Sequence, residues 1–258
     1  MDILSFGTAQ IATFLLVLAR VGGIFTTAPV FGNVHVAVRV RVAIALSLAF
    51  VFLPLARYNA SQLEFLPFAL AVVKECMVGL AMGFLAGLMF GAIQMAGAYV
   101  DLVVGFGFAN VVDPMIREHN AVIGQVQNLA ATLLFLAING HHLVIRGLAD
   151  SFSILPLGAM SFSPSAAGGI MGIFAAIFLA GLKIAAPVVG AIFLTDVSLG
   201  ILARTVPQLN VFVVGFPAKL AVALFTVIAV MPLAFGVMTQ LFTGLHRDIL
   251  MLVKHLAI

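Results

Sequence analysis

The stretch from residue 68 to residue 100 limits the possible folds more than any other part of the sequence. It is mostly apolar and contains no residue that forces a helix to end. As a single helix, its 33 residues would extend about 50 Å, at 1.5 Å per residue. The hydrocarbon core of a bilayer is only roughly 30 Å thick. We therefore expect this helix to tilt steeply or to stand partly outside the bilayer.

Composition supports a membrane protein. Hydrophobic residues make up 64% of the 258 residues and charged residues only 8%, whereas soluble domains have about 45–50% and roughly 25%. We expect an all-α integral membrane protein whose long helices, interrupted by proline and glycine, are arranged as hairpins. The apolar segments that predict these helices are residues 3–31, 42–55, 68–100, 121–138, 170–203 and 211–244.

One stretch is typical of a linker between two parts of the chain. Residues 155–169 include Pro156 and Pro164 among several serines and glycines, and such clusters mark loops. We therefore expect an N-terminal helical part at residues 1–160 and a C-terminal part at residues 161–258.

The C-terminal part has the pattern of one long helical hairpin. Pro187 lies inside its first apolar segment and Pro217 inside its second, so we expect a break in each arm. The tail, residues 246–258, alternates charged and apolar residues as an amphipathic helix does.

Glycines recur every four residues in the long third segment, at Gly79, Gly83, Gly87 and Gly91, and Gly97 follows. Residues four apart lie one above another on a helix. Each glycine costs about 1 kcal/mol relative to alanine in a helix, so such a row needs a reason. In membranes the usual reason is close helix–helix packing. Because four residues overshoot one turn by about 40°, this ridge would contact more than one neighbour.

The segment after this helix, residues 105–114, reads GFGFANVVDP. It is too rich in glycine for a stable helix, yet it stays apolar. Phe106 and Phe108 have glycine neighbours, and we expect them to be mobile and exposed to whatever this loop contacts.

Several charges lie in or beside apolar runs, where a charge costs about 2.5–3.5 kcal/mol at the bilayer centre. They mark either a polar path or ion pairs between subunits, or else local pairing near helix ends. For Glu75 and Asp101 local pairing is favoured, and for Lys183 and Lys219 the two interpretations are balanced. Two lysines on facing hairpin arms imply that a partner chain supplies acid. The full set is Arg20, Glu75, Asp101, Lys183, Asp196 and Lys219.

No pattern in the sequence predicts catalysis or a cofactor. The only cysteine is Cys76, and His141 and His142 have no carboxylate at ligand spacing. Catalytic triads, HExxH and Walker motifs are absent from the sequence. With a net charge of only +3 and no basic stripe, we expect contact with membrane lipid and none with nucleic acid.

A series of short motifs, in order along nearly the whole chain, matches a known family. They are residues 20–22, 29–32, 41–54, Glu75 with the glycine ridge, 97–101, 105–114, 139–142, 151–152, Pro156, 183–187, 196–200 and 204–219. Each is weak alone, but together they are specific. The sequence resembles the FliR family of flagellar export-gate proteins and, more distantly, its injectisome counterparts.

This resemblance implies a non-enzymatic subunit of the bacterial inner membrane, in the flagellar basal body. In that family one FliR joins several copies of FliP and FliQ at the entrance of a channel for unfolded protein substrates, and FlhB associates with them. A FliP-like N-terminal part would be joined to a FliQ-like C-terminal hairpin. The family's plug would fall within residues 101–120, on Gly105, Phe106, Gly107, Phe108, Asn110, Asp113 and Pro114.

Two other classes of function compete with this interpretation. A secondary transporter would place a substrate site at broken helices, such as those expected at Pro187 and Pro217, but the two halves of the sequence show no internal repeat. An intramembrane enzyme is disfavoured because no catalytic set of residues is evident.

Overall fold

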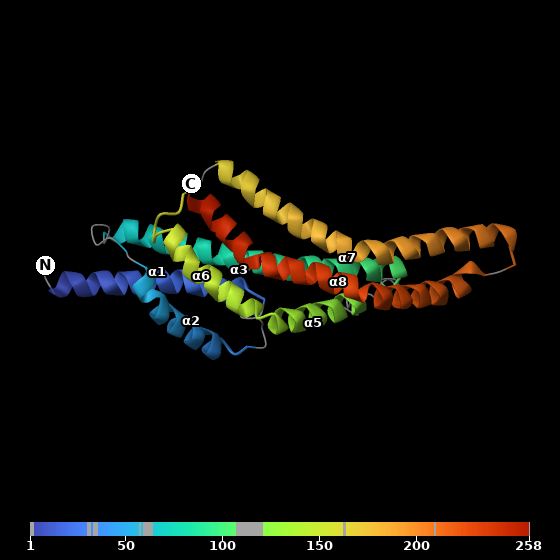
Figure 1. Cartoon of the computed structure of the whole chain (residues 1–258), viewed down its shortest axis with the longest axis horizontal. Coiled ribbons are helices and arrows are strands. Elements are labelled where there is room, and N and C mark those ends of the chain that lie inside the picture. Colours follow the sequence, from blue (N-terminus) through green and yellow to red (C-terminus); the bar gives the residue numbers. More distant parts are fainter. Residues whose placement is uncertain are drawn as a thin grey trace. The chain divides into compact units, whose positions relative to one another are not determined.

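The protein is all-α. The computed structural model describes residues 3–29, 32, 36–56, 58, 64–106, 121–161, 164–208 and 210–257, and this part of the chain contains no strand. The predicted fold class is therefore confirmed. The helices in the described ranges are α1 (Ile3–Thr27), α2 (Val38–Phe52), the 3-10 turn η1 (Leu53–Leu55), α3 (Phe65–Val104), α5 (Val122–Ala137), α6 (Gly140–Ile154), α7 (Pro164–Thr205) and α8 (Val211–Ala257) (Figure 1).

Among the described residues, five helices are long and apolar enough to cross a membrane, or six if α5 and α6 together form one broken span. Three of them are longer than one span needs. Helices α3, α7 and α8 contain 40, 42 and 47 residues, which corresponds to about 60–70 Å of helix. The expectation of an overlong third helix is confirmed, and the same property extends to both arms of the hairpin.

The sequence predicted that a proline breaks each arm of the hairpin, but both arms are continuous helices. Pro187 lies inside continuous α7, and Pro217 and Pro232 lie inside continuous α8. Proline is tolerated in membrane helices because neighbouring groups can satisfy the freed carbonyls. Helix α7 also begins earlier than expected, at Pro164, where a proline in the first turn loses no helical hydrogen bond.

The chain forms two compact units, and helices α3, α7 and α8 each contribute to both. The sequence predicted a single boundary between residues 160 and 161. The two units are each made of several stretches of the chain, so they do not test that boundary, and it stays a prediction. Unit 1 consists of Met1–Met89, Asn139–Ala175 and Thr243–Ile258, and unit 2 consists of Phe90–Ile138 and Ala176–Phe242.

In unit 1, α1 packs against the first part of α3, and α2 and α6 both contact α1. The tail of α8 completes the core of this unit, because Leu245, Ile249 and Val253 are fully buried at helical spacing. The amphipathic pattern of the tail therefore packs against protein. Its end is fastened by a hydrogen bond of 3.0 Å from the backbone N–H of Ser161 to the carbonyl of Leu256.

In unit 2, an aromatic cluster joins three helices. The rings of Phe90 (α3), Phe135 (α5) and Phe242 (α8) are buried, with centroids 5.0–5.3 Å apart. Such tilted and edge-on pairs add stability beyond the burial of their area. Within this unit, α7 and α8 run side by side as an antiparallel hairpin (Figure 1), so the predicted hairpin arrangement is present.

The glycine ridge of α3 is a tight packing face only at its two ends. In unit 1, a Cβ on Gly79 would overlap the backbone carbonyl of Arg20, and a Cβ on Gly83 would lie 2.8 Å from the carbonyl oxygen of Ile24. In unit 2, a Cβ on Gly97 would overlap the backbone of Gly124 on α5. The glycines of α3 thus contact two neighbouring helices, but Gly97 lies outside the four-residue repeat, so the second contact does not result from the predicted 40° drift.

The middle of the ridge is different. A Cβ on Gly87 would make only an ordinary contact of 3.4 Å, and one on Gly91 would meet no atom within 4 Å. At these two positions the chain itself gives no reason for the absence of a side chain.

We expect Gly83→Leu to lower the stability of the isolated protein by about 1–3 kcal/mol, because α1 must move away from α3. The measurement is the midpoint of thermal unfolding in detergent. Gly91→Leu is the matched control on the same helix and should leave the midpoint unchanged. Equal midpoints for the two variants would contradict tight packing at Gly83.

Candidate functional site

A buried ion pair lies at the centre of unit 1. Arg20 on α1 and Glu75 on α3 are both fully buried, and the Arg20 Nε atom lies 2.5 Å from Glu75 Oε2. The guanidinium also lies over the ring of Phe152, 4.6 Å from its centroid. In an apolar helix each charge would be costly alone, so the pairing explains how α1 and α3 can both carry one.

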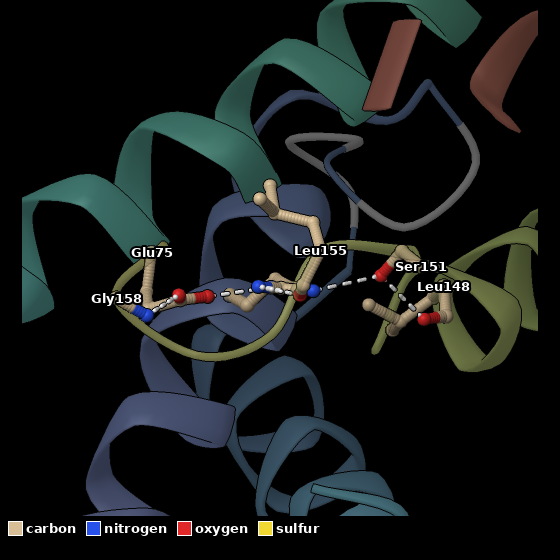
Figure 2. A network of polar contacts seen from close by, with 6 residues as sticks. Glu75, Leu148, Ser151, Leu155 and Gly158 are labelled. Carbon is tan, nitrogen blue, oxygen red and sulfur yellow. Dashed lines mark hydrogen bonds and ion pairs between the residues drawn. The ribbon is translucent and has the colours of Figure 1, made fainter. Parts of the chain in front are cut away.

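The remaining donors of Arg20 reach α6 and the connection that follows it. Nη1 donates to the hydroxyl of Ser151 at 3.1 Å, and Nη2 donates to the carbonyl of Leu155 at 3.0 Å. The Ser151 hydroxyl in turn donates to the carbonyl of Leu148 at 2.7 Å. Figure 2 shows these contacts as one continuous row.

The other oxygen of Glu75 binds the backbone of the same connection. Glu75 Oε1 accepts a hydrogen bond of 2.8 Å from the N–H of Gly158, at the far end of the row in Figure 2. Gly158 has a φ of +77°, a conformation that favours glycine, and this turn aims the N–H at the carboxylate. The network therefore fastens α1, α3, α6 and the α6–α7 connection to one another.

A second buried acid on α3 lies in unit 2. Asp101 is 4% exposed, and its two carboxylate oxygens each accept a hydrogen bond of 3.1 Å, from the N–H groups of Ile123 and Gly124. Those groups belong to the first turn of α5, which has no partner for them within its own helix. The structure therefore shows local pairing at both Glu75 and Asp101, which is the interpretation that the sequence favoured.

Helix α3 ends three residues after Asp101, at Val104. Gly105 has a φ of +104°, and the N–H groups of Gly105 and Phe106 both donate to the carbonyl of Asp101, at 3.2 and 3.1 Å. A glycine in this conformation is a common helix terminator. The predicted plug segment therefore leaves α3 at a defined residue.

Of the predicted plug residues, the structure describes Gly105 and Phe106. Phe106 was expected to be exposed, but it is half-buried, and its ring meets that of Phe216 on α8 edge-on, with centroids 6.5 Å apart. The other predicted plug residues beyond Gly105 lie outside the described residues: Gly107, Phe108, Asn110, Asp113 and Pro114.

The hairpin of unit 2 carries its own ion pair. Lys219 Nζ lies 2.5 Å from Asp196 Oδ1, and both side chains are partly exposed. Asp196 of α7 therefore supplies an acid to Lys219 within the chain, and acid from a partner chain stays a prediction for Lys183. Lys183 is exposed, and no ion pair of the described residues includes it.

Comparison with known proteins places the sequence in a family. The profile of "Bacterial export proteins, family 1" matches residues 11–245. The chain is 38% identical to the flagellar biosynthetic protein FliR of Bacillus subtilis (strain 168), with 89% of this chain and 90% of that protein covered. It is 32% identical to the FliR protein of Escherichia coli (strain K12), with 89% and 88% covered.

The chain belongs to the FliR family. It is thus a protein of the flagellar export apparatus, with relatives as distant as the FliR protein of Aquifex aeolicus (strain VF5), which is 28% identical over 91% of both chains. The Arg20–Glu75 and Asp196–Lys219 pairs and the Asp101 contacts of this FliR-family chain lie within the residues that the family profile matches.

Sequence reasoning identified the charged residues of the site but missed the groups that bind them. Leu155 and Gly158 take part through backbone atoms, which no side-chain pattern reveals. Ser151 was noted only as part of a family motif, and Phe216 was not singled out. A proline next to Leu155 and a glycine at residue 158 were the available signals of a turn.

We expect Arg20→Gln to destabilise this FliR-family protein strongly, by about 3–5 kcal/mol, because Glu75 would stay buried without its partner. The measurement is thermal or denaturant unfolding in detergent. Arg146→Gln is the matched control and should change stability little. The Arg146 side chain is exposed and its Nε atom lies as far as 4.0 Å from Asp150 Oδ2, and exposed pairs contribute about 0–1 kcal/mol.

A double-mutant cycle completes this test. The variant Arg20→Gln with Glu75→Gln should lose less stability than the two single losses added together, because the two residues are in contact. Additive losses would contradict a direct pairing of these side chains.

Proposed function

We propose that this protein is a channel subunit of the flagellar type III export gate and that it closes the channel with the segment following α3. It assembles with FliP-type and FliQ-type subunits at the channel entrance in the bacterial inner membrane, as part of the flagellar basal body, and an FlhB-type protein associates with them. Its substrates are unfolded secreted proteins, and its role is structural and not enzymatic. Family membership and the described contacts of Asp101 at the end of α3 and the start of α5 support this proposal.

The observation that carries the proposal is the base of the predicted plug. The end of α3 and the start of α5 are held together by Asp101, and residues 107–120 connect these two points. A segment that carries Phe106 and Phe108 at its start and is anchored at both ends can seal a narrow pore by excluding water. Glycines next to the phenylalanines allow it to swing aside when a substrate passes.

The length and exposure of the hairpin helices favour an assembly over a lone membrane protein. Helix α8 has 47 residues, and only 6% of its most apolar stretch is buried within the chain. So much exposed apolar helix exceeds what one bilayer crossing covers, and unlike subunits around it would cover the rest. The alternative of a secondary transporter loses its main support, because α7 and α8 are continuous at Pro187 and Pro217.

We expect native mass spectrometry of the tagged protein, co-expressed with neighbouring membrane genes, to detect one copy bound to multiple copies of two smaller hydrophobic chains. Extraction in mild detergent keeps such a complex intact. A monomer or homo-oligomer without unlike chains would contradict the export-gate assembly and favour a transporter.

Deleting residues 107–112 should leave the complex assembled but raise its ion conductance, because the channel would lose the apolar part of its plug. The measurement is ion flux through the purified complex in lipid vesicles. A deletion of residues 59–63, which precede α3 in the sequence, is the control and should not change the flux. Unchanged flux after the plug deletion would contradict the plug assignment.

A further inference from the structure

Helix α7 has two opposite faces in unit 2. One face packs inside the unit, where an added Cβ on Gly181 would lie 2.7 Å from the carbonyl oxygen of Ala92 on α3. Buried side chains recur around this glycine at helical spacing: Ile177, Ile184, Val188 and Ile192. The opposite face, which we call the Lys183 stripe, consists of exposed residues at the same spacing: Leu179, Lys183, Ala186, Gly190, Leu194 and Val197.

The stripe contains one residue with two polar groups that need partners. Lys183 takes part in no ion pair of the described residues. Four residues later α7 contains Pro187, which has no N–H, so the carbonyl of Lys183 loses the donor that a helix normally supplies. In an apolar environment an unpaired charge and an unbonded carbonyl are both costly. Whatever covers the stripe must therefore be polar opposite Lys183.

Water and lipid headgroups are too far from Lys183 to serve. From Met171 to Leu194 every residue except Lys183 is apolar, and this stretch forms about 36 Å of helix. A hydrocarbon core is roughly 30 Å thick, and Lys183 lies in the middle of the stretch. Snorkelling to an interface works for lysines near helix ends and does not explain a lysine at this position.

The shape of the stripe favours another helix as its cover. Ala186 and Gly190 lie about one and two turns after Lys183, and an added Cβ on Gly190 would meet no atom within 4 Å. Small residues in such a row let a second helix approach the backbone closely.

The charge of the hairpin indicates an unlike partner. Residues 176–242 contain a single acidic residue, Asp196, and it already pairs with Lys219. The basic residues of the same range outnumber it: Lys183, Arg204 and Lys219. A second copy of the hairpin therefore offers no spare acid, and charge complementarity favours a different chain that supplies one.

We propose that the Lys183 stripe docks an apolar helix of an unlike subunit, and that an aspartate or glutamate of this helix pairs with Lys183. This inference rests on the proposed assembly with unlike subunits. It goes further by assigning one face of α7, and one charge on it, to the contact.

The variant Lys183→Met removes the charge but keeps an unbranched side chain. The partner's carboxylate would stay buried without its cation, so the fraction of the co-expressed protein bound to unlike chains in native mass spectrometry should fall at least about tenfold. Lys183→Arg keeps the charge and should assemble as the wild type does. Lys254→Met, which removes an exposed lysine from the last turn of α8, is the matched control and should also assemble normally.

Gly190→Leu tests whether the cover is a helix. Lipid tails can rearrange around a leucine, but a closely packed helix cannot, so assembly should fall as it does for Lys183→Met. The thermal unfolding midpoint of the uncomplexed chain in detergent should not fall for either variant, because neither residue makes a packing or ionic contact that would be lost within the chain.

Cross-linking identifies the acid directly. A carbodiimide joins a lysine amine to an adjacent carboxyl group as an amide, with loss of water. Treatment of the wild-type complex should give a peptide that links Lys183 to an aspartate or glutamate of an unlike chain. The Lys183→Arg complex should assemble without this link, because arginine has no amine to couple. Lys183→Glu combined with a lysine in place of the identified acid should restore the assembly that each single reversal loses.

The other outcomes overturn the inference in distinguishable ways. A link from Lys183 to an acid of a second copy of this chain would show a homotypic contact. Loss of a bound anionic phospholipid from Lys183→Met, with the same subunits retained, would show that lipid covers the stripe. Normal assembly of Lys183→Met would exclude the pairing and leave the export-gate assembly standing. If the wild-type protein binds no unlike chains, the proposed function is wrong and the inference fails with it.

Discussion

The cost of placing a charge in an apolar interior governs the arrangement of unit 1. Arg20 and Glu75 are each fully buried, and neither could be tolerated there without the other. Their pairing leaves further donors and one further acceptor oxygen to be satisfied. These are satisfied by Ser151, Leu155 and Gly158, so one ion pair determines where α6 and the following connection must lie.

Helix α3 uses the same device twice. In each unit a buried acid of α3 binds backbone N–H groups of a segment distant in sequence: Glu75 binds Gly158 in unit 1, and Asp101 binds Ile123 and Gly124 in unit 2. In each unit glycines of α3 also let a second helix approach its backbone. Carboxylates suit this task because they accept several hydrogen bonds in a setting where unsatisfied N–H groups are costly.

Much of the fold follows from the sequence because it depends on apolar length and period. The overlong α3, the hairpin of α7 and α8 and the amphipathic tail were all predictable from such patterns. The prolines of the hairpin were misjudged because the rule that proline breaks helices comes from helices in water. Of the two partners of Glu75, only Arg20 could be predicted, because a charged residue in an apolar segment is visible in the sequence. The backbone N–H of Gly158 could not be predicted, because every residue except proline has one.

The same physics separates the charges by role. Arg20 of α1 and Glu75 and Asp101 of α3 are buried and satisfied within the chain, so they shape the protein itself. Those of the hairpin stay at its surface: the Asp196–Lys219 pair is partly exposed, and Lys183 is exposed without an ion pair among the described residues. A charge on an apolar helix must meet water or another protein to be tolerated. Among these charges of the described residues, those of the exposed hairpin, and not those of the buried clusters, therefore require something outside the chain.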